Sequence, residues 1–152
     1  HLIGEDNDAC ELKQPQHKLG TDAGSTDPDS TPVFHHPRSY GSYPRILGKY
    51  VRDEHVLTLE DAIRKMSGAV ADRLLIRDRG LLREGMYADI VVFDPATIHE
   101  HSTYEKPNQA STGVREVFVN GVEVVRDGRH TGAKPGRVVR GPGWRATAGK
   151  EQ

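Results

Sequence analysis

Residues 80–94, Gly-Leu-Leu-Arg-Glu-Gly-Met-Tyr-Ala-Asp-Ile-Val-Val-Phe-Asp, mark the point where the character of the chain changes. The run 88–94 follows a glycine and is rich in β-branched residues, which predicts a buried strand. Residues 1–80 show loops and helical periodicity, whereas residues 81–140 show strand and hairpin patterns. We therefore expect an α/β chain whose two parts meet near Arg79-Gly80.

The dipeptide Asn120-Gly121 is the clearest local signal after this boundary. Both central positions of a type I′ turn need positive φ, which asparagine and glycine tolerate, so Asn-Gly between two β-branched runs predicts a hairpin. A polar loop over 95–113 separates this hairpin from the first strand. The runs expected to form further strands are 114–119, 122–125 and 137–140.

Apolar residues at helical spacing predict two helices before the boundary. Pro44 suits the first turn of one helix, because its missing N–H falls where the turn has no acceptor for it. Thr58 is a good N-cap for the second, with Asp61 three residues on in a capping-box-like arrangement, and Gly68 is the expected end. The apolar stripes are Ile46, Leu47, Tyr50 and Val51 in the first helix and Leu59, Ala62, Ile63 and Met66 in the second.

The remaining segments are short or irregular. A short helical segment is expected before Pro15, a very short strand at 18–22 and a helical turn at 70–75. Residues 24–32 concentrate Gly, Pro, Asp and Ser, which predicts irregular backbone. Residues 141–152 carry glycine, proline and charge without a pattern, so we expect a flexible tail.

Composition suggests one globular unit that belongs to something larger. The chain has 152 residues, of which only 35% are hydrophobic, below the usual ~45–50% of a reference set that also counts glycine. Its first residue is His1 rather than methionine, and we expect the chain to be a piece of a longer protein. The 21 Lys and Arg against 22 Asp and Glu leave a net charge of −1, which argues against a nucleic-acid or membrane-surface partner.

Targeting and redox signals are few. No run reaches the ~18 apolar residues of a membrane span, and no signal-peptide pattern is visible. Cys10 is the only cysteine, which excludes an internal disulfide and a Cys-x-x-Cys zinc motif. A reducing, cytoplasmic setting is therefore the expectation.

Asp22 is the first candidate for chemistry. It follows a short apolar stretch and a glycine, so its simplest role is that of a turn or N-cap residue. The other role is that of a carboxylate at the C-terminal end of a barrel strand. There it would ligate a metal or take a proton from metal-bound water.

The polar run 35–41 holds the other candidates, His36, Arg38 and Tyr40. Arg38 could hold a substrate carboxylate, and His35 or His36 could act as a ligand or a general acid. An exposed loop with solvated histidines is the simpler alternative. The stretch His99-Glu100-His101 lies in the polar loop and is expected at the surface. The sequence contains no Walker loop, dinucleotide fingerprint, nucleophile elbow or Cys/His pair.

Three stretches carry a family resemblance: Gly20-Thr21-Asp22-Ala23, residues 36–52 and residues 79–94. Together they resemble the C-terminal end of an amidohydrolase-superfamily enzyme, and most closely the N-acyl-D-amino-acid deacylases (D-aminoacylases). The first is similar to the Gly-Ser/Thr-Asp-Gly that ends the eighth barrel strand, with alanine in place of the last glycine. The second is similar to the stretch that follows in the deacylases, and the third, with its Gly-x-x-Ala-Asp core, to the return into a small β domain.

The resemblance implies the C-terminal part of a TIM-like (β/α)8 metal-dependent hydrolase barrel, followed by a small β-rich domain of the composite β-sandwich kind. Residues 1–80 would end the barrel, residues 81–140 would form the small domain, and residues 141–152 the tail. Asp22 would be the last residue of a zinc site. It would deprotonate the zinc-bound water that attacks the amide carbonyl and then protonate the leaving amine.

The implied reaction is hydrolysis of a small molecule, an N-acyl-D-amino acid, with Arg38, His36 and Tyr40 as substrate-binding residues. The other zinc ligands of such enzymes are a His-x-His pair, a bridging Cys or modified Lys, and two further His from earlier strands that this chain does not contain. We therefore expect the chain alone to bind zinc weakly or not at all and to be inactive. Two alternatives stay open: a cyclic-amide hydrolase of the hydantoinase or dihydroorotase type, and a non-catalytic β-rich interaction module.

Overall fold

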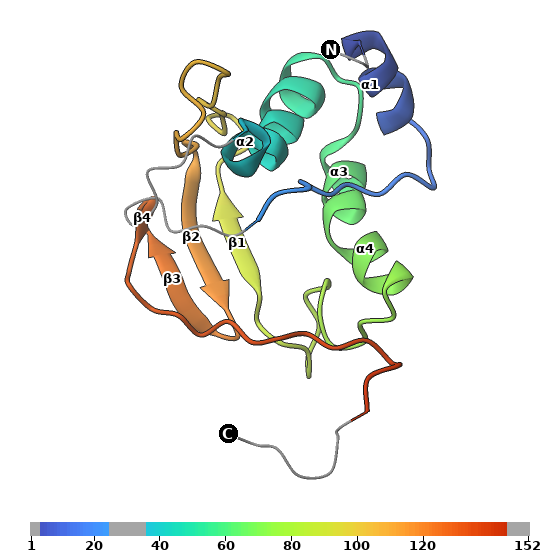
Figure 1. The fold of residues 1–152 in the computed structure, drawn as a ribbon, viewed down its shortest axis with the longest axis vertical. Coiled ribbons are helices and arrows are strands. Elements are labelled where there is room, and N and C mark those ends of the chain that lie inside the picture. Colours follow the sequence, from blue (N-terminus) through green and yellow to red (C-terminus); the bar gives the residue numbers. More distant parts are fainter. Residues whose placement is uncertain (1–3, 25–35, 146–152) are drawn as a thin grey trace.

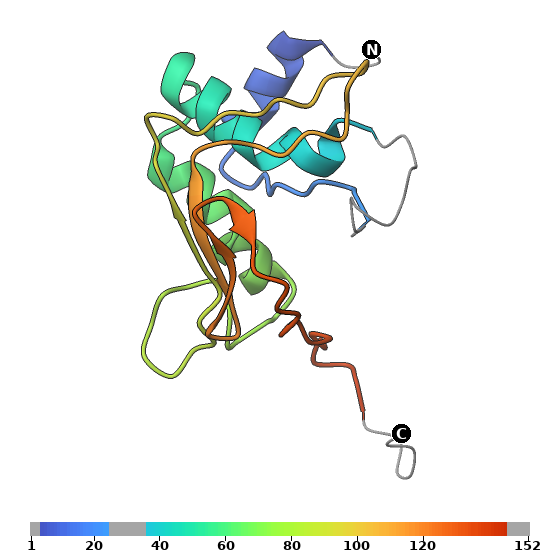
Figure 2. The same cartoon turned by 90° about the vertical axis from the view of Figure 1, so that its left-hand side faces the viewer.

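A four-stranded antiparallel sheet lies beside a group of short helices in the computed structural model, which describes residues 4–24 and 36–145. Three of the helical elements gather at one end of the molecule, and two run along the sheet (Figures 1 and 2). The elements are α1 (Glu5–Leu12), α2 (Arg38–Arg45), the π-helix η1 (Ile46–Asp53), α3 (Leu59–Met66), α4 (Gly68–Arg73), β1 (Ile90–Phe93), β2 (Val114–Val119), β3 (Val122–Arg126) and β4 (Arg129–His130).

The sheet follows the chain in the order β1-β2-β3-β4. The β2–β3 hairpin is confirmed, and its turn has the expected backbone, with φ of 51° at Asn120 and 79° at Gly121. Both values lie in the left-handed region that a type I′ turn requires. The long loop after β1 returns the chain so that β2 pairs antiparallel with β1.

The helical region departs from expectation at Pro44, which lies inside α2 rather than opening a helix. Proline removes an i−4 hydrogen bond and crowds the preceding turn, and the residues directly after α2 adopt the wider π-helix η1. The widened turn is seen where Glu54 N–H donates to the Lys49 carbonyl at 2.8 Å. No helix in the described part of the chain is both long and apolar enough to cross a membrane.

The start of α3 is confirmed, because Thr58 Oγ1 accepts the N–H of Asp61 at 3.2 Å as an N-cap should. Its end differs from the prediction. The helix stops at Met66, Ser67 leaves the helical region, and Gly68 begins α4 instead of terminating the run. The short helical segment before Pro15 is confirmed as α1.

The core forms where the helices meet the loop after β1, with Ile98 at its centre at 1% exposure. Two glycines allow this close packing. A Cβ on Gly48 would lie 2.8 Å from the Ile98 carbonyl oxygen, and one on Gly113, where φ is +87°, would lie 2.5 Å from Ile98 Cα. The buried members of the core are Leu12, Ile46, Leu47, Tyr50, Leu57, Ala62 and Ile98.

Three strand predictions are wrong in detail. The strand at 88–94 is not buried: β1 is an edge strand, and Val91 and Val92 are 55% and 37% exposed. Residues 18–22 form no strand, since the described chain offers them no neighbouring strand and Leu19 N–H bonds the Lys65 carbonyl instead. Residues 137–140 form none either, because the sheet ends at β4. Most of the loop 24–32 and the last part of the tail lie outside the described residues.

A polar cluster around Asp89 fixes the hairpin turn to the rest of the chain. The Asp89 carboxylate accepts the N–H of Asn120 at 2.8 Å and pairs with Arg79. Arg79 also donates to the Asn120 side chain at 2.6 Å, and Asn120 in turn donates to the Pro135 carbonyl at 2.7 Å. Asp89, in the Gly-x-x-Ala-Asp core, thus links the segment after the helices, the hairpin and the C-terminal segment.

We expect Asp89→Ala to lower the free energy of unfolding at neutral pH by about 1–3 kcal/mol, because the Asn120 N–H and Arg79 lose their acceptor. Burial raises the pKa of Asp89, but the Asn120 N–H and Arg79 outweigh it and hold the pKa below 3.8. The contribution is therefore complete above pH 3.8 and disappears as pH falls through the lower, folded-state pKa.

Urea unfolding of wild type and variant at neutral and acidic pH measures this difference. Glu84→Ala, at an exposed glutamate in the preceding turn, is the control. A difference that stays constant down to low pH would contradict the assignment.

Candidate functional site

Asp22 follows a segment without helix or strand structure, and the backbone of this segment is held three residues earlier, at Leu19. Leu19 donates its N–H to the Lys65 carbonyl at 3.1 Å, and its own carbonyl accepts the Tyr43 hydroxyl at 3.4 Å. Asp22 itself has φ of 49°, a left-handed conformation that aspartate tolerates better than most residues. Its carboxylate is 88% exposed, so it is available to groups outside the described structure.

Arg38, the first residue of α2, lies opposite Asp22. Its Nη2 is 3.1 Å from Asp22 Oδ2, and its side chain is 46% exposed. Exposed ion pairs of this kind contribute only ~0–1 kcal/mol to stability. A ligand carboxylate or metal can therefore replace either partner at little energetic cost to the fold.

His36 and Tyr40 take different positions around Arg38. His36 is exposed, its Nδ1 accepts the Arg38 N–H at 3.1 Å, and its ring meets that of Tyr104 edge-on at 5.2 Å between centroids. Tyr40 is half-buried in the first turn of α2. The structure thus brings Asp22, His36 and Arg38 together, whereas Tyr40 packs into the helix beside them.

A cavity of about 620 Å³ lies between the start of α1, the helix α2 and the loop 100–105. His36 and Arg38 are among the described residues that line it, and Asp22 and Tyr40 are not. Its walls also carry Glu5, Arg45, Glu100 and Glu105, together with the hydroxyl side chains of Ser42, Ser102 and Thr103.

An ion-pair network in the cavity wall was not anticipated from the sequence. Arg45 contacts Glu100 at 2.9 Å and Glu5 at 2.6 Å, and Lys49 contacts Glu5 at 2.5 Å. The hydrogen bond and charge of Lys49 lower the pKa of Glu5. The i, i+4 spacing of Arg45 and Lys49 places both cations on one face of a helical run, but their partners Glu5 and Glu100 lie at least 40 positions away.

This network corrects one expectation about the polar loop. His99 and His101 are exposed as expected. Glu100 between them is not a surface residue, because its side chain is 15% exposed and pairs with Arg45. A residue in an extended segment points to the opposite side from its two neighbours, which separates Glu100 from the two histidines.

The described residues offer one candidate metal ligand, Asp22, and not a complete metal site. The described residues contain no group of three or more His, Cys, Asp or Glu placed to hold an ion. Cys10 lies exposed on α1, and Asp22 offers a single accessible carboxylate. Because zinc takes carboxylate oxygen alongside imidazole nitrogen and thiolate sulfur, Asp22 is suited to complete a site whose other ligands come from elsewhere.

Comparison with known proteins confirms the resemblance noted from the sequence. Residues 18–125 match the model of the Amidohydrolase family. A D-aminoacylase of Alcaligenes xylosoxydans xylosoxydans is 44% identical over 104 residues, which are 68% of this chain and 22% of that protein.

Two solved structures show the same likeness. A D-aminoacylase with a binuclear metal center superimposes with a TM-score of 0.78 and 37% identity, over 86% of this chain and 27% of that one. N-acyl-D-glutamate deacylase from Bordetella bronchiseptica, complexed with zinc and a phosphonate inhibitor, gives a TM-score of 0.72 and 37% identity, over 84% of this chain and 27% of that one. The chain thus spans about a quarter of the length of the relatives it matches.

The two arginines of α2 should respond differently to substitution. We expect Arg38→Met to change the free energy of unfolding by less than about 1 kcal/mol, because its ion pair is exposed. Arg45→Met should cost about 1–3 kcal/mol, because it leaves the largely buried Glu100 without its partner. Urea unfolding of both variants provides the comparison. Equal losses would mean that Arg38 is structural and not available to a ligand.

Proposed function

The chain belongs to the amidohydrolase family, and we propose that it is the C-terminal portion of a zinc-dependent deacylase that hydrolyses the amide bond of N-acyl-D-amino acids. The observation that carries the proposal is the exposed carboxylate of Asp22 beside the exposed guanidinium of Arg38, 3.1 Å apart. One group suits proton transfer and metal ligation, and the other suits the carboxylate of an amino-acid substrate.

Asp22 would serve as both a zinc ligand and the proton-transfer group. A bound zinc ion lowers the pKa of a water molecule to ≈ 7, which makes hydroxide available near neutral pH. The Asp22 carboxylate would accept the proton of the attacking water and pass it to the amide nitrogen as the C–N bond breaks. The left-handed backbone at Asp22 and the bonded Leu19 three residues earlier support this role, because they hold the main chain that carries the carboxylate.

Arg38 would bind the α-carboxylate of the substrate. Guanidinium presents a planar pair of N–H donors that match the two oxygens of a carboxylate. The His36 ring accepts the Arg38 backbone N–H, and we assign His36 and Tyr40 to the same end of the substrate pocket. When substrate binds, Arg38 would exchange its contact with Asp22 for the substrate, which frees Asp22 for the reaction.

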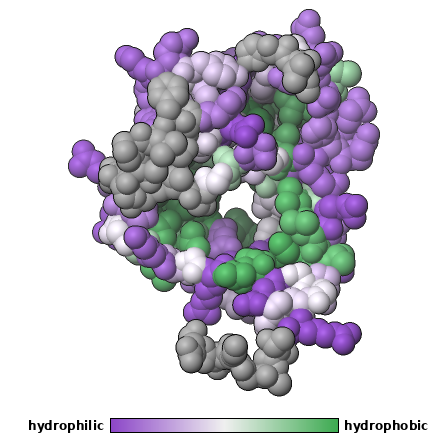
Figure 3. Space-filling model, viewed as in Figure 1, coloured by the Kyte–Doolittle hydropathy of each residue, from purple (hydrophilic) through white to green (hydrophobic). Residues whose placement is uncertain are grey.

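We also propose the finer architecture: the described part of residues 1–80 ends a (β/α)8 barrel, and residues 81–140 form part of a composite β-sandwich. Most of the expected tail at 141–152 lies outside the described residues. Exposed valines on the edge strand β1 support the sandwich, since a sheet face with such residues is normally covered. Apolar residues also surround an opening between the sheet and the α3–α4 side (Figure 3). The barrel and sandwich partners would cover these surfaces.

The expected partner is a small N-acyl amino acid rather than nucleic acid or a membrane, since the formal net charge is −1. The single cysteine supports a cytoplasmic setting. A hydantoin has no free carboxylate, so the placement of Arg38 favours open-chain N-acyl amino acids over the hydantoinase alternative. Dihydroorotate carries a ring carboxylate, so the dihydroorotase alternative is separated by the substrate test below. A non-catalytic interaction module has no need for an exposed pair of Asp22 and Arg38, so the pair favours an enzyme over that alternative.

In the full-length protein we expect Asp22→Asn to lower kcat about 100- to 10,000-fold, the range typical of a lost general base. Asp72→Asn, at an exposed aspartate of α4, is the control with the same change of charge. Turnover of N-acyl-D-amino acids and of cyclic ureides by the same preparations separates the two hydrolase alternatives. Unchanged kcat in Asp22→Asn would rule out the assigned role, and no turnover of either substrate class would favour the interaction module.

Zinc titration of the 152-residue chain, in competition with a chromophoric chelator, tests the ligand count. We expect the chelator to retain the zinc, because one exposed carboxylate contributes far less than the three or four ligands of a zinc site. Stoichiometric zinc binding that Asp22→Asn abolishes would show that the chain supplies further ligands itself.

A further inference from the structure

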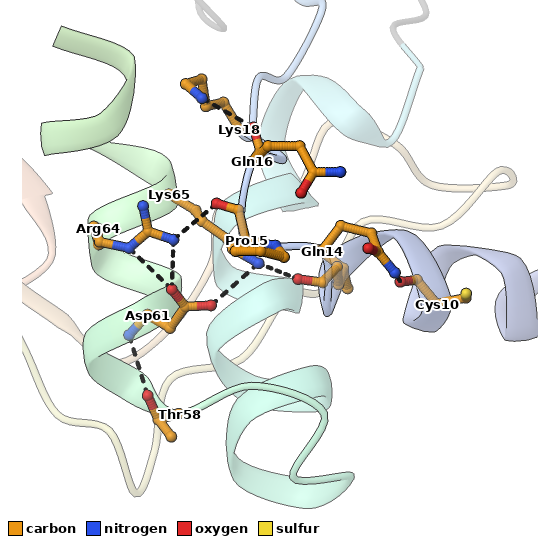
Figure 4. Close-up of polar contacts among 10 residues, drawn as sticks. Cys10, Gln14, Pro15, Gln16, Lys18, Thr58, Asp61, Arg64 and Lys65 are labelled. Carbon is orange, nitrogen blue, oxygen red and sulfur yellow. Dashed lines mark hydrogen bonds and ion pairs between the residues drawn. The ribbon is translucent and has the colours of Figure 1, made fainter. Parts of the chain in front are cut away.

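Lys65 on α3 has no exposed surface, although its side chain carries a charge. Its Nζ donates to the Leu12 carbonyl and lies 3.1 Å from Asp61 Oδ2 (Figure 4). Asp61 is itself held in place, because Arg64 contacts its carboxylate at 2.7 Å and Thr58 caps its N–H. The buried Lys65 ammonium therefore pairs with Asp61 on its own helix and donates to one backbone carbonyl, that of Leu12.

The segment 12–19 is attached to the last turn of α3 at three points. Lys65 Nζ binds the carbonyl of Leu12, and Arg64 Nη2 donates to the carbonyl of Pro15 at 3.2 Å. The Lys65 carbonyl then accepts the N–H of Leu19 at 3.1 Å. Because this segment pairs with no strand among the described residues, the end of α3 is its main backbone support.

These attachments lead directly to Asp22. Leu19, the last attached residue, is also bonded through its carbonyl to Tyr43 of α2. Arg38 at the start of α2 pairs with Asp22. Contacts therefore connect the last turn of α3 to the 12–19 segment, that segment to α2, and α2 to Asp22 through Arg38.

Stability alone does not explain a buried lysine at this position. Replacing a buried ion pair by apolar groups of similar volume is often neutral or stabilising, because burial of the charges costs about as much as their attraction returns. The hydrogen bond from Lys65 to the Leu12 carbonyl fixes the position of the 12–19 segment along α3. A methionine of similar size has no donor and cannot fix that position.

We infer that Lys65 is a positioning residue, which sets the place of the Asp22 carboxylate relative to Arg38 by anchoring the 12–19 segment. This inference rests on the proposed function only where it concerns catalysis. The anchoring itself is a property of the chain, and it is measurable without turnover.

The first test is amide hydrogen exchange in the 152-residue chain carrying Lys65→Met. Methionine keeps the length and volume of the side chain but cannot bind the Leu12 carbonyl. The Leu19 N–H bond to the main-chain carbonyl of residue 65 is retained in the variant. We expect exchange over residues 13–19 to accelerate about tenfold, as a local opening of the segment that follows Leu12, while exchange in β2 and β3 stays unchanged. Lys106→Met, at an exposed lysine, removes the same charge and should change neither region.

A second variant, Arg64→Met, tests the same inference if Lys65→Met does not fold. Arg64 is 47% exposed, so Arg64→Met should leave the core intact. It releases the Pro15 carbonyl and also removes the contact of Arg64 with the Asp61 carboxylate. We expect a smaller acceleration, centred on residues 14–18. Unchanged exchange over 12–22 in the variant that folds would overturn the inference, whatever the protein catalyses.

The catalytic consequence is measured in the full-length protein. A displaced carboxylate should lower kcat about 10- to 100-fold and leave KM within about twofold, because Arg38 still binds substrate. Faster exchange with unchanged kcat, in a protein that Asp22→Asn inactivates, would overturn the positioning role. If Asp22→Asn itself remains active, the proposed function fails, and the exchange result alone decides whether Lys65 anchors the segment.

Discussion

The helical region and the sheet are joined at Ile98, and the placement of the candidate site depends on this junction. Ile98 is 1% exposed, and its backbone passes so close to Gly48 and Gly113 that neither position has room for a Cβ. Arg52 of η1 donates to the Ile98 carbonyl at 2.7 Å, so a backbone group that burial would leave unsatisfied is paired across the junction. Because Ile98 leads into the loop that carries Glu100, and η1 continues from α2, this contact fixes the loop against the helix that begins with Arg38.

The site separates the groups that hold the structure from the groups left free to react. The cavity-wall residues Glu5, Arg45 and Glu100 neutralise one another, and Lys49, outside the wall, also pairs with Glu5. These charges are already used within the fold. Asp22 and Arg38 form a single, mostly exposed contact that a ligand can replace. A residue that must release its partner during a reaction cannot also be required for folding, and the exposure of this pair meets that condition.

The sequence predicts well the features that short-range chemistry decides. The Asn120-Gly121 hairpin and the Thr58 cap of α3 depend on residues within four positions of one another, and both form as expected. The exposure of β1, the burial of Lys65 and the pairing of Glu100 depend on partners far away in the chain. The Lys65 contact with Leu12 spans 53 positions and that of Arg45 with Glu100 spans 55, and no local pattern carries that information. The failed strand at 18–22 belongs to the same class, because a strand exists only where a neighbour pairs with it.

The absence of a strand at 18–22 and the presence of only one candidate zinc ligand, Asp22, have the same physical cause. A strand at 18–22 and a zinc site at Asp22 each need groups that the described residues do not provide: a neighbouring backbone in one case, and additional donor atoms in the other. In their place, the α3 turn binds the backbone of residues 12–19, and Arg38 binds the carboxylate of Asp22. The segment is therefore held by α3 and α2, and Arg38 holds the Asp22 carboxylate before any further ligand is in place.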